Sequence, residues 1–215
     1  MKPTEEYANY QHAFDYFNGE LFGGRLPPCL ITFQRRRNAR GYFAPLGIAA
    51  RHNVTLRTNE IAMNPDTFVG RNDKGILSTL VHEMVHLWQA HEGKPGRGGY
   101  HNRQWAREML RLGLRPISYD QPGKMTGQCV THEIIVEGAF DKAADRLLAS
   151  GFRLRWQSAL VNIPEGNGAA PLEVVPKRNK VTYTCPVCAQ KAWAKPRARL
   201  LCGFCGEPMT SLTGC

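Results

Sequence analysis

The chain has 215 residues, enough for one ordinary domain and a small additional module but short for two full domains. Hydrophobic residues make up 42% of the sequence and charged residues 21%, which excludes a wholly disordered chain, and no apolar run is long enough for a transmembrane helix. The formal net charge of +10 favours a polyanionic partner, most often a nucleic acid.

The first part of the chain alternates between helical and strand-like patterns. Residues 4–22 predict an amphipathic helix, because Thr4 can cap it and aromatic side chains recur at helical spacing. Gly23 and Gly24 end this helix. Short β-like runs follow, separated by turn residues, and we expect them to form a small sheet of unassigned order: 30–33, 41–44, 54–56 and 61–63.

A second and stronger helical pattern covers residues 75–92. The glycine-rich run 93–99 cannot continue it, because glycine and proline both disfavour helix. A third helix is predicted over 101–112, a strand over 129–136 and a further helix over 139–150.

The composition changes after residue 156. Residues 157–176 have the composition of a linker, and the remaining segment is compact, basic and rich in cysteine. We therefore predict an α+β domain over residues 1–156, a linker over 157–176 and a small zinc-binding module over 177–215.

His82 and His86 belong to an HExxH motif on the helix predicted over 75–92. Four residues span about one helical turn, so both imidazoles lie on one face and can reach a single zinc ion. Glu83 is rotated by roughly 100° from His82, so it can lie beside the metal without binding it, as a general base requires. The alternative is a pair of histidines on a solvated helix face.

A catalytic zinc ion needs a third protein ligand and an open position for water. We favour His101, because the glycine-rich run before it can turn the chain back toward the metal. Glu108 remains the alternative, at a distance from His86 where some zinc proteases place a ligand. His91 is expected to be an ordinary histidine, since it points about 180° away from His82 on a straight helix.

The motif and its surroundings resemble the SprT-like (Spartan-like) family of zinc metalloproteases. The segments that carry the resemblance are residues 17–27, 80–89, 93–106 and 126–128. The resemblance implies a zincin-like metalloprotease domain followed by a zinc ribbon, in which His82, His86 and His101 bind catalytic zinc and Glu83 is catalytic. It also implies DNA-associated protein substrates, among them DNA–protein crosslinks.

The chemistry that these residues permit is peptide hydrolysis. Zinc lowers the pKa of its bound water to about 7, and Glu83 can take a proton from that water and later deliver it to the leaving amine. Tyr100 and His132 are candidates for stabilising the oxyanion, although a structural role is the stronger interpretation of each.

Two CxxC pairs lie near the end of the sequence, Cys185 with Cys188 and Cys202 with Cys205. Each pair can supply two thiolates to one tetrahedral ion, so the spacing predicts a zinc ribbon with a second, structural zinc ion. A redox role for one pair is the weaker alternative. We interpret Cys215 as a spare thiol.

Basic residues surround an aromatic one between the two CxxC pairs. Cations can bind phosphates, and an indole can stack on an unpaired base. We therefore predict that five residues contact nucleic acid: Lys191, Trp193, Lys195, Arg197 and Arg199. The alternative is a tryptophan packed in a tiny core among solvated charges. A second basic block, residues 35–37 with Arg40, is either a further contact or an exposed loop.

The sequence therefore predicts a zinc metalloendopeptidase that acts on DNA-bound proteins. We expect a cytoplasmic monomer with no membrane partner, which binds single-stranded or partly unpaired DNA without sequence specificity. Two other functions stay open: a nucleic-acid-binding adaptor with an idle protease site, and a general intracellular peptidase whose basic charge concerns solubility.

Overall fold

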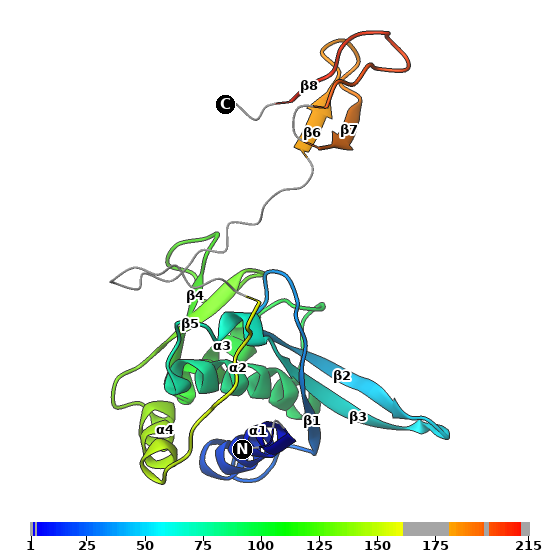
Figure 1. Cartoon of the computed structure of the whole chain (residues 1–215). Coiled ribbons are helices and arrows are strands. Elements are labelled where there is room, and N and C mark those ends of the chain that lie inside the picture. Colours follow the sequence, from blue (N-terminus) through cyan, green and yellow to red (C-terminus); the bar gives the residue numbers. More distant parts are fainter. Residues whose placement is uncertain (1, 3, 161–180, 196–197, 212–215) are drawn as a thin grey trace. The chain divides into compact units, whose positions relative to one another are not determined.

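The computed structural model describes residues 2, 4–160, 181–195 and 198–211 (Figure 1). The chain divides into two compact units, residues 1–168 and 169–215. Most of the linker predicted over 157–176 lies outside the described residues.

Four helices of the first unit frame its core, and their described bounds are α1 (Thr4–Phe22), α2 (Asp73–Glu92), α3 (Arg103–Arg111) and α4 (Ala139–Ala149). All four helices were predicted, with ends that differ from the prediction by two residues or fewer, except α1, whose bounds are as predicted. α1 forms because its aromatic residues fall on one buried face, with Glu5 and Glu6 in its first turn, where the helix dipole favours acids.

The main sheet has the strand order β1-β3-β2. β1 (Cys29–Phe33) pairs parallel with β3 (Asn53–Met63), which pairs antiparallel with β2 (Gly41–Ala50). The prediction of separate runs at 54–56 and 61–63 is wrong, because β3 is continuous through polar residues 57–60. Its backbone hydrogen bonds to β2 hold it extended even where it leaves the core, so apolar alternation is not needed there.

A second, two-stranded sheet follows the third helix. β4 (Leu114–Ser118) pairs antiparallel with β5 (Val130–Ile134), which lies within the strand predicted over 129–136. β4 was not predicted, because Arg115 and Pro116 interrupt its apolar pattern. A short 3-10 helix, Pro65–Thr67, closes the turn after β3.

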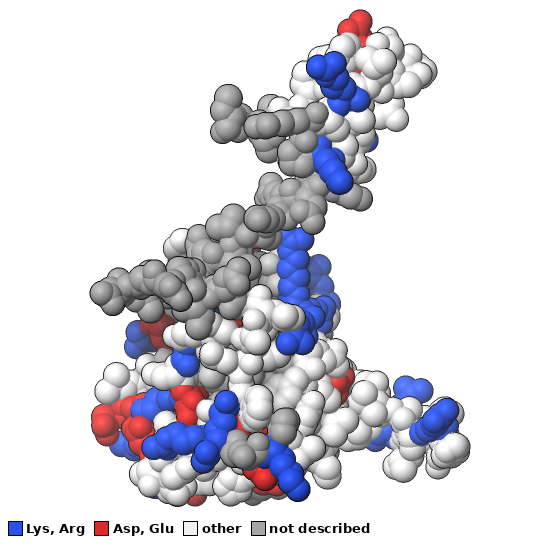
Figure 2. All heavy atoms as spheres, viewed as in Figure 1, with Lys and Arg blue, Asp and Glu red and all other residues white. Residues whose placement is uncertain are grey.

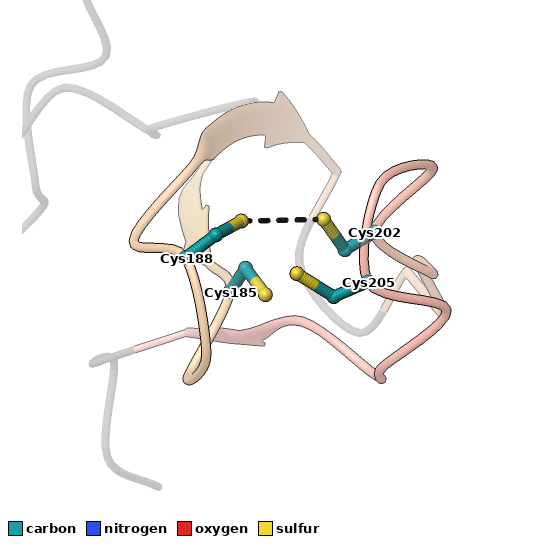
Figure 3. A group of neighbouring side chains, drawn as sticks. All are labelled: Cys185, Cys188, Cys202 and Cys205. Atoms are coloured by element: carbon teal, nitrogen blue, oxygen red, sulfur yellow. Dashed lines mark hydrogen bonds between the residues drawn. The ribbon is translucent and has the colours of Figure 1, made fainter.

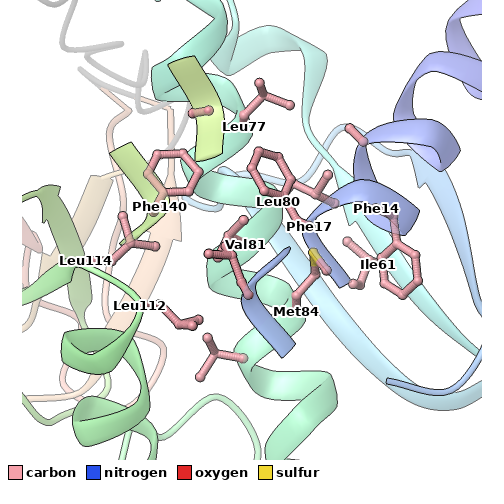
Figure 4. Packing of buried hydrophobic residues seen from close by; sticks show 14 of the residues in the cluster. Phe14, Phe17, Ile61, Leu77, Leu80, Val81, Met84, Leu112, Leu114 and Phe140 are labelled. Atoms are coloured by element: carbon pink, nitrogen blue, oxygen red, sulfur yellow. The ribbon is translucent and has the colours of Figure 1, made fainter. Parts of the chain in front are cut away.

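The core of this unit is built around α2. Leu77, Leu80 and Met84 are fully buried, and they belong to one hydrophobic cluster with residues of α1, β3 and α4, as Figure 4 shows. Cores of this kind pack as densely as organic crystals, so a side chain on α2 is held in a fixed direction. The helix that carries the HExxH motif is therefore a rigid base for a site.

The second unit is a small sheet of β6 (Val181–Thr184), β7 (Lys191–Ala194) and β8 (Thr210–Ser211) in the order β7-β6-β8. Its buried residues include Val181, Tyr183 and two cysteines. The structure as a whole is of the α+β class, as predicted. Among the described residues, none of the helices combines the length and apolar character needed to cross a bilayer.

Candidate metal centres

The first candidate centre begins on α2, which is well defined at both ends. The Asn72 side chain accepts a hydrogen bond from the Gly75 N–H at 2.8 Å, and the helix stops at Gly93. His82 and Glu83 are buried in the middle of this helix, and His86 follows one turn later, half-buried. The two imidazole rings are 5.3 Å apart between centroids, so they share one face of the helix.

His101 joins them through a contact between distant segments. Its backbone forms an antiparallel bridge with Gly127, with N···O distances of 2.9 and 3.0 Å. Its Nδ1 lies 3.1 Å from the Gly127 carbonyl oxygen and donates to it, which leaves Nε2 as the free lone pair. The bridge therefore fixes both the position and the tautomer of this imidazole.

The three imidazoles meet at one point. One nitrogen from each of His82, His86 and His101 lies within 4.8 Å of the other two. Nε2 of His82 is 3.2 Å from Nε2 of His101. Two ligands of a tetrahedral zinc ion with Zn–N bonds of about 2.0–2.1 Å are separated by about 3.3 Å. The donor set and its spacing fit zinc, with His82, His86 and His101 as the residues that would hold it.

Glu83 lies beside the histidines and against the edge of the main sheet. A Cβ atom added at Gly41, the first residue of β2, would be only 3.3 Å from Cγ and Oε1 of Glu83. Burial raises the pKa of the Glu83 carboxyl to about 8, because desolvation disfavours the carboxylate. A metal cation bound by the histidines would lower this pKa. Sequence reasoning missed Gly41, whose only signal was a glycine at the start of a strand.

His132 contacts His82 through the ring nitrogen that does not face His101. Its Nδ1 is 3.1 Å from Nδ1 of His82, and its Nε2 is 2.9 Å from the Ser78 hydroxyl, which donates to the Gly75 carbonyl. Burial lowers the pKa of His132 to about 3, and the charges of Arg40 and Arg71 lower it further, so the ring is neutral. His132 is thus packed behind a candidate ligand, where it orients the imidazole of His82, as second partners of metal-binding histidines do.

The indole ring of Trp105, on α3, packs against the imidazole rings of all three histidines. Its ring centroid is 4.8, 5.3 and 4.3 Å from those of His82, His86 and His101. The indole is fully buried, so it excludes water from that side of the cluster and limits the rotation of each ring. Sequence reasoning gave it no role in the site.

The alternative ligands lie elsewhere. Both carboxylate oxygens of Glu108 accept hydrogen bonds from Arg111, at 2.9 and 2.5 Å, and Glu108 is outside the histidine group. His91 is exposed near the end of α2. Tyr100, which was a candidate for stabilising the oxyanion, is half-buried, and the Arg97 guanidinium lies 5.7 Å from its ring centre.

The second candidate centre consists of Cys185, Cys188, Cys202 and Cys205, whose sulfur atoms lie within 4.8 Å of one another (Figure 3). Sγ of Cys188 is 3.5 Å from Sγ of Cys202. Backbone hydrogen bonds from Cys205 and Phe204 lower the pKa of the Cys202 thiol to about 7, which favours the thiolate that binds metal. Four converging thiols of this kind fit a tetrahedral zinc ion.

Three of the five residues predicted to contact nucleic acid lie on β7 or directly after it. Because side chains alternate along a strand, Lys191 and Trp193 share one face, and Lys195 continues it. Trp193 is 67% exposed, so its interpretation as a core residue is wrong. Arg199 is exposed as well, whereas Arg197 lies outside the described residues.

Comparison with known proteins agrees with this geometry. The model of the SprT-like family matches residues 10–121. Among curated proteins, an uncharacterized protein of Salmonella typhimurium encoded in the mucB 3' region is 54% identical over 41 residues, which are 19% of this chain and 55% of that protein. The chain thus spans about half the length of this relative. Since the family match extends over more than half of the 215 residues, the chain belongs to the SprT-like family.

Proposed function

We propose that the protein is a zinc-dependent endopeptidase with a zincin-like active site, and that it cleaves proteins associated with DNA, including DNA–protein crosslinks. The observation that carries the proposal is the convergence of His82, His86 and His101 beside the buried carboxyl of Glu83. Three imidazoles are the usual ligands of a zinc ion that keeps one position open. Family membership supports a metalloprotease-like domain.

Zinc held by these histidines would supply Lewis-acid polarisation of a peptide carbonyl and acidification of the attacking water. The chain's own residues supply the proton transfers and the positioning. Glu83 takes the proton of the water as it attacks, and gives it to the leaving amine when the C–N bond breaks. Because Glu83 is buried against β2 and is not itself a ligand, its carboxyl stays free for this exchange.

Burial lowers the pKa values of His82 and His101 and keeps both rings neutral, while hydrogen bonds on their far sides fix the tautomers. His101 donates from Nδ1 to a backbone carbonyl, and His82 donates from Nδ1 to His132. In both rings Nε2 is therefore left to bind a metal. These partners restrict the ring orientations without entering the reaction.

The module with four cysteines is proposed to bind DNA as a zinc ribbon. Support comes from the face of β7, where an exposed indole lies between two lysines. Base stacking on an aromatic ring tolerates any sequence, and lysines meet phosphates, so this face suits single-stranded or unpaired DNA. Binding there would raise the local concentration of a DNA-bound substrate near the protease domain.

The decisive experiment is proteolysis of a protein bound to a DNA oligonucleotide, compared with the same protein free of DNA, at low and high salt. We expect zinc-dependent cleavage that DNA accelerates and that salt slows, because salt weakens phosphate contacts. Glu83→Gln is the matched control, since it keeps the shape of the side chain but removes the base. Its rate should fall by roughly 10²–10⁴-fold while its zinc content is unchanged.

The other outcomes point to the other functions. Equal rates with and without DNA at low salt would identify a general peptidase. DNA binding by zinc-loaded protein that cleaves neither substrate would identify an adaptor with an idle site.

A further inference from the structure

The hairpin of β2 and β3 continues past the sheet as an arm, here defined as residues 45–57. It projects to the right in Figure 1, and Figure 2 shows it as a narrow extension of the surface. Every arm residue except Ala50 is exposed. The arm takes no part in the histidine cluster, so neither the core nor the metal centre accounts for it.

The arm has a defined structure with a β-bulge at its base. The pairing of β2 with β3 shifts between Ala44 and Ile48. Leu46 has a φ of +49°, and its N–H donates to the Asn59 side chain at 3.0 Å. A Cβ at Gly47 would come within 2.9 Å of the Ala44 Cβ, so glycine is required there. Such a bulge strengthens the twist of a two-stranded ribbon.

The arm carries exposed aliphatic side chains. Ile48 pairs with Thr58 on one face of the ribbon, and Val54 and Leu56 lie near the tip, where the pairing shifts again between Ala49 and Ala50. Val54 and Leu56 are 66% and 64% exposed, and Ile48 is 36% exposed. Neighbouring exposed aliphatic side chains of this kind mark a surface that another molecule covers.

The arm is also basic. Arg51 and Arg57 are exposed, and within the described part of the chain neither forms an ion pair. The sequence has no acidic residue between Glu20 and Glu60 to neutralise them. Two copies of this arm would repel each other, whereas a polyanion complements it.

Further arginines lie at the other end of β2. Arg37 and Arg40 are exposed without an ion pair among the described residues, whereas Arg35 pairs with Asp66. Arg40 precedes Gly41, the neighbour of Glu83, and its charge acts on His132. Cations therefore flank β2 at both of its ends.

We propose that the arm binds duplex DNA, with its two strands in the major groove, its aliphatic side chains on base edges and sugars, and its arginines on phosphates. The major groove is about 12 Å wide and admits a two-stranded ribbon. The proposal rests on the DNA partner of the proposed function and adds a contact for duplex on the hairpin whose other end, at Gly41, lies against Glu83. This contact is distinct from the ribbon's contact for unpaired bases. A protein bound to that duplex would be held at the domain that carries Glu83.

The test measures binding alone, in full-length protein carrying Glu83→Gln so that hydrolysis plays no part. The anisotropy of a labelled duplex of about two helical turns and of a labelled single strand is followed over a range of salt concentrations. Arg51→Gln with Arg57→Gln should weaken duplex binding by about tenfold at 0.1 M salt and reduce the salt slope by about 1.8. Single-strand binding should be unchanged.

Two further variants make the result specific. Val54→Thr with Leu56→Thr keeps strand propensity and charge, and it should also weaken duplex binding. Arg103→Gln with Arg107→Gln removes the same charge from exposed positions of α3 and should leave duplex affinity within twofold. Circular dichroism and zinc content check that each variant is folded.

The proposal is overturned if duplex affinity survives the arm substitutions or falls equally in the α3 control. It is also overturned if the threonine variant sediments differently but binds duplex with unchanged affinity. The aliphatic side chains of the arm would then contact a second copy of the chain. If the arm substitutions abolish binding to anionic phospholipid vesicles and leave duplex binding intact, the partner of the arm is a membrane surface and the proposal is overturned. If Trp193→Ala abolishes single-strand binding while the arm variants have no effect, only the ribbon contact of the proposed function stands.

Discussion

Nδ1 of His132 lies 3.1 Å from Nδ1 of His82, so a residue of β5 positions the first histidine of the HExxH motif. The hydrogen bonds run in one direction, from His82 to His132, to Ser78 and to the Gly75 carbonyl. Each donor in this series has one acceptor, which fixes the tautomers of both rings. His132 is therefore a positioning residue, and the idea that it stabilises an oxyanion is not supported by its place behind a ligand.

Replacing His132 should weaken the catalytic zinc site. His132→Leu removes the acceptor for His82, and we expect zinc affinity at that site to fall by about 10–100-fold. His132→Asn keeps an acceptor and should recover part of the loss. Competition with a chromogenic chelator measures this, and the cysteine site serves as an internal control. Equal affinity in all three proteins would show that the contact has no influence on metal binding.

Zinc stoichiometry tests the identity of the third ligand. Two separate donor groups predict about two zinc ions per chain. His101→Ala should leave about one, because the four cysteines are untouched. Glu108→Ala should keep two, since Glu108 bonds to Arg111 and is outside the histidine group. Mass spectrometry of the native protein counts the ions, and the opposite pattern would exchange the roles of these two residues.

Gly41→Ala should reduce activity without removing zinc. The added methyl would be 3.3 Å from Oε1 of Glu83 and 3.0 Å from the Ala62 carbonyl oxygen, so the carboxyl must shift. A displacement of a few tenths of an ångström should lower kcat by about tenfold. Gly19→Ala, which meets nothing within 4 Å in α1, is the control and should stabilise the protein by about 0.5–1 kcal/mol. Full activity of Gly41→Ala would mean that Glu83 tolerates the change.

Acid should destabilise the metal-free protein. Burial lowers the pKa of His86 and of His132 to about 3, so below pH ~6.5 the unfolded chain binds two protons that the native state does not. Glu83, with its pKa raised to about 8, binds one proton in the native state that the unfolded chain lacks above pH ~4.5, which offsets one of them.

The net difference of about one proton predicts that the free energy of unfolding falls by about 1.4 kcal/mol per pH unit between pH ~6.5 and ~4.5. Burial also lowers the pKa values of His82 and His101, which steepens the loss. Urea unfolding of chelator-treated protein at several pH values measures this slope. His132→Asn should make it shallower, and a stability that rises toward acid would contradict the assignment of neutral buried imidazoles.

Trp193→Ala should weaken single-stranded DNA binding by about 1–3 kcal/mol, because the exposed indole of β7 would no longer stack on a base. Phe204, which is 86% exposed between Cys202 and Cys205, provides the matched control. Phe204→Ala removes an aromatic ring of similar exposure from another part of the same unit. Anisotropy of a labelled oligonucleotide measures both. Equal losses would indicate general damage to the unit instead of stacking at Trp193.

The order of the strands in the main sheet could not be predicted from the sequence. The sequence pattern predicted that one strand ends before the polar residues 57–60 and another begins after them. β3 runs through these residues because its backbone pairs with β2. The same pairing brings Gly41 against Glu83, although they are far apart in the chain. Strand continuity and close approaches of this kind depend on long-range hydrogen bonds, which a local pattern does not contain.

The sequence by itself determined the parts of the sites that depend on short spacing. Histidines four apart on a helix must share a face, as His82 and His86 do, and cysteines three apart can turn toward one ion. Only the tertiary structure decided that His101 joins the cluster while Glu108 turns to Arg111, because the bridge to Gly127 brings His101 back to α2. The supporting contacts of His132 and Trp105 were decided in the same way, since packing between separate elements sets them.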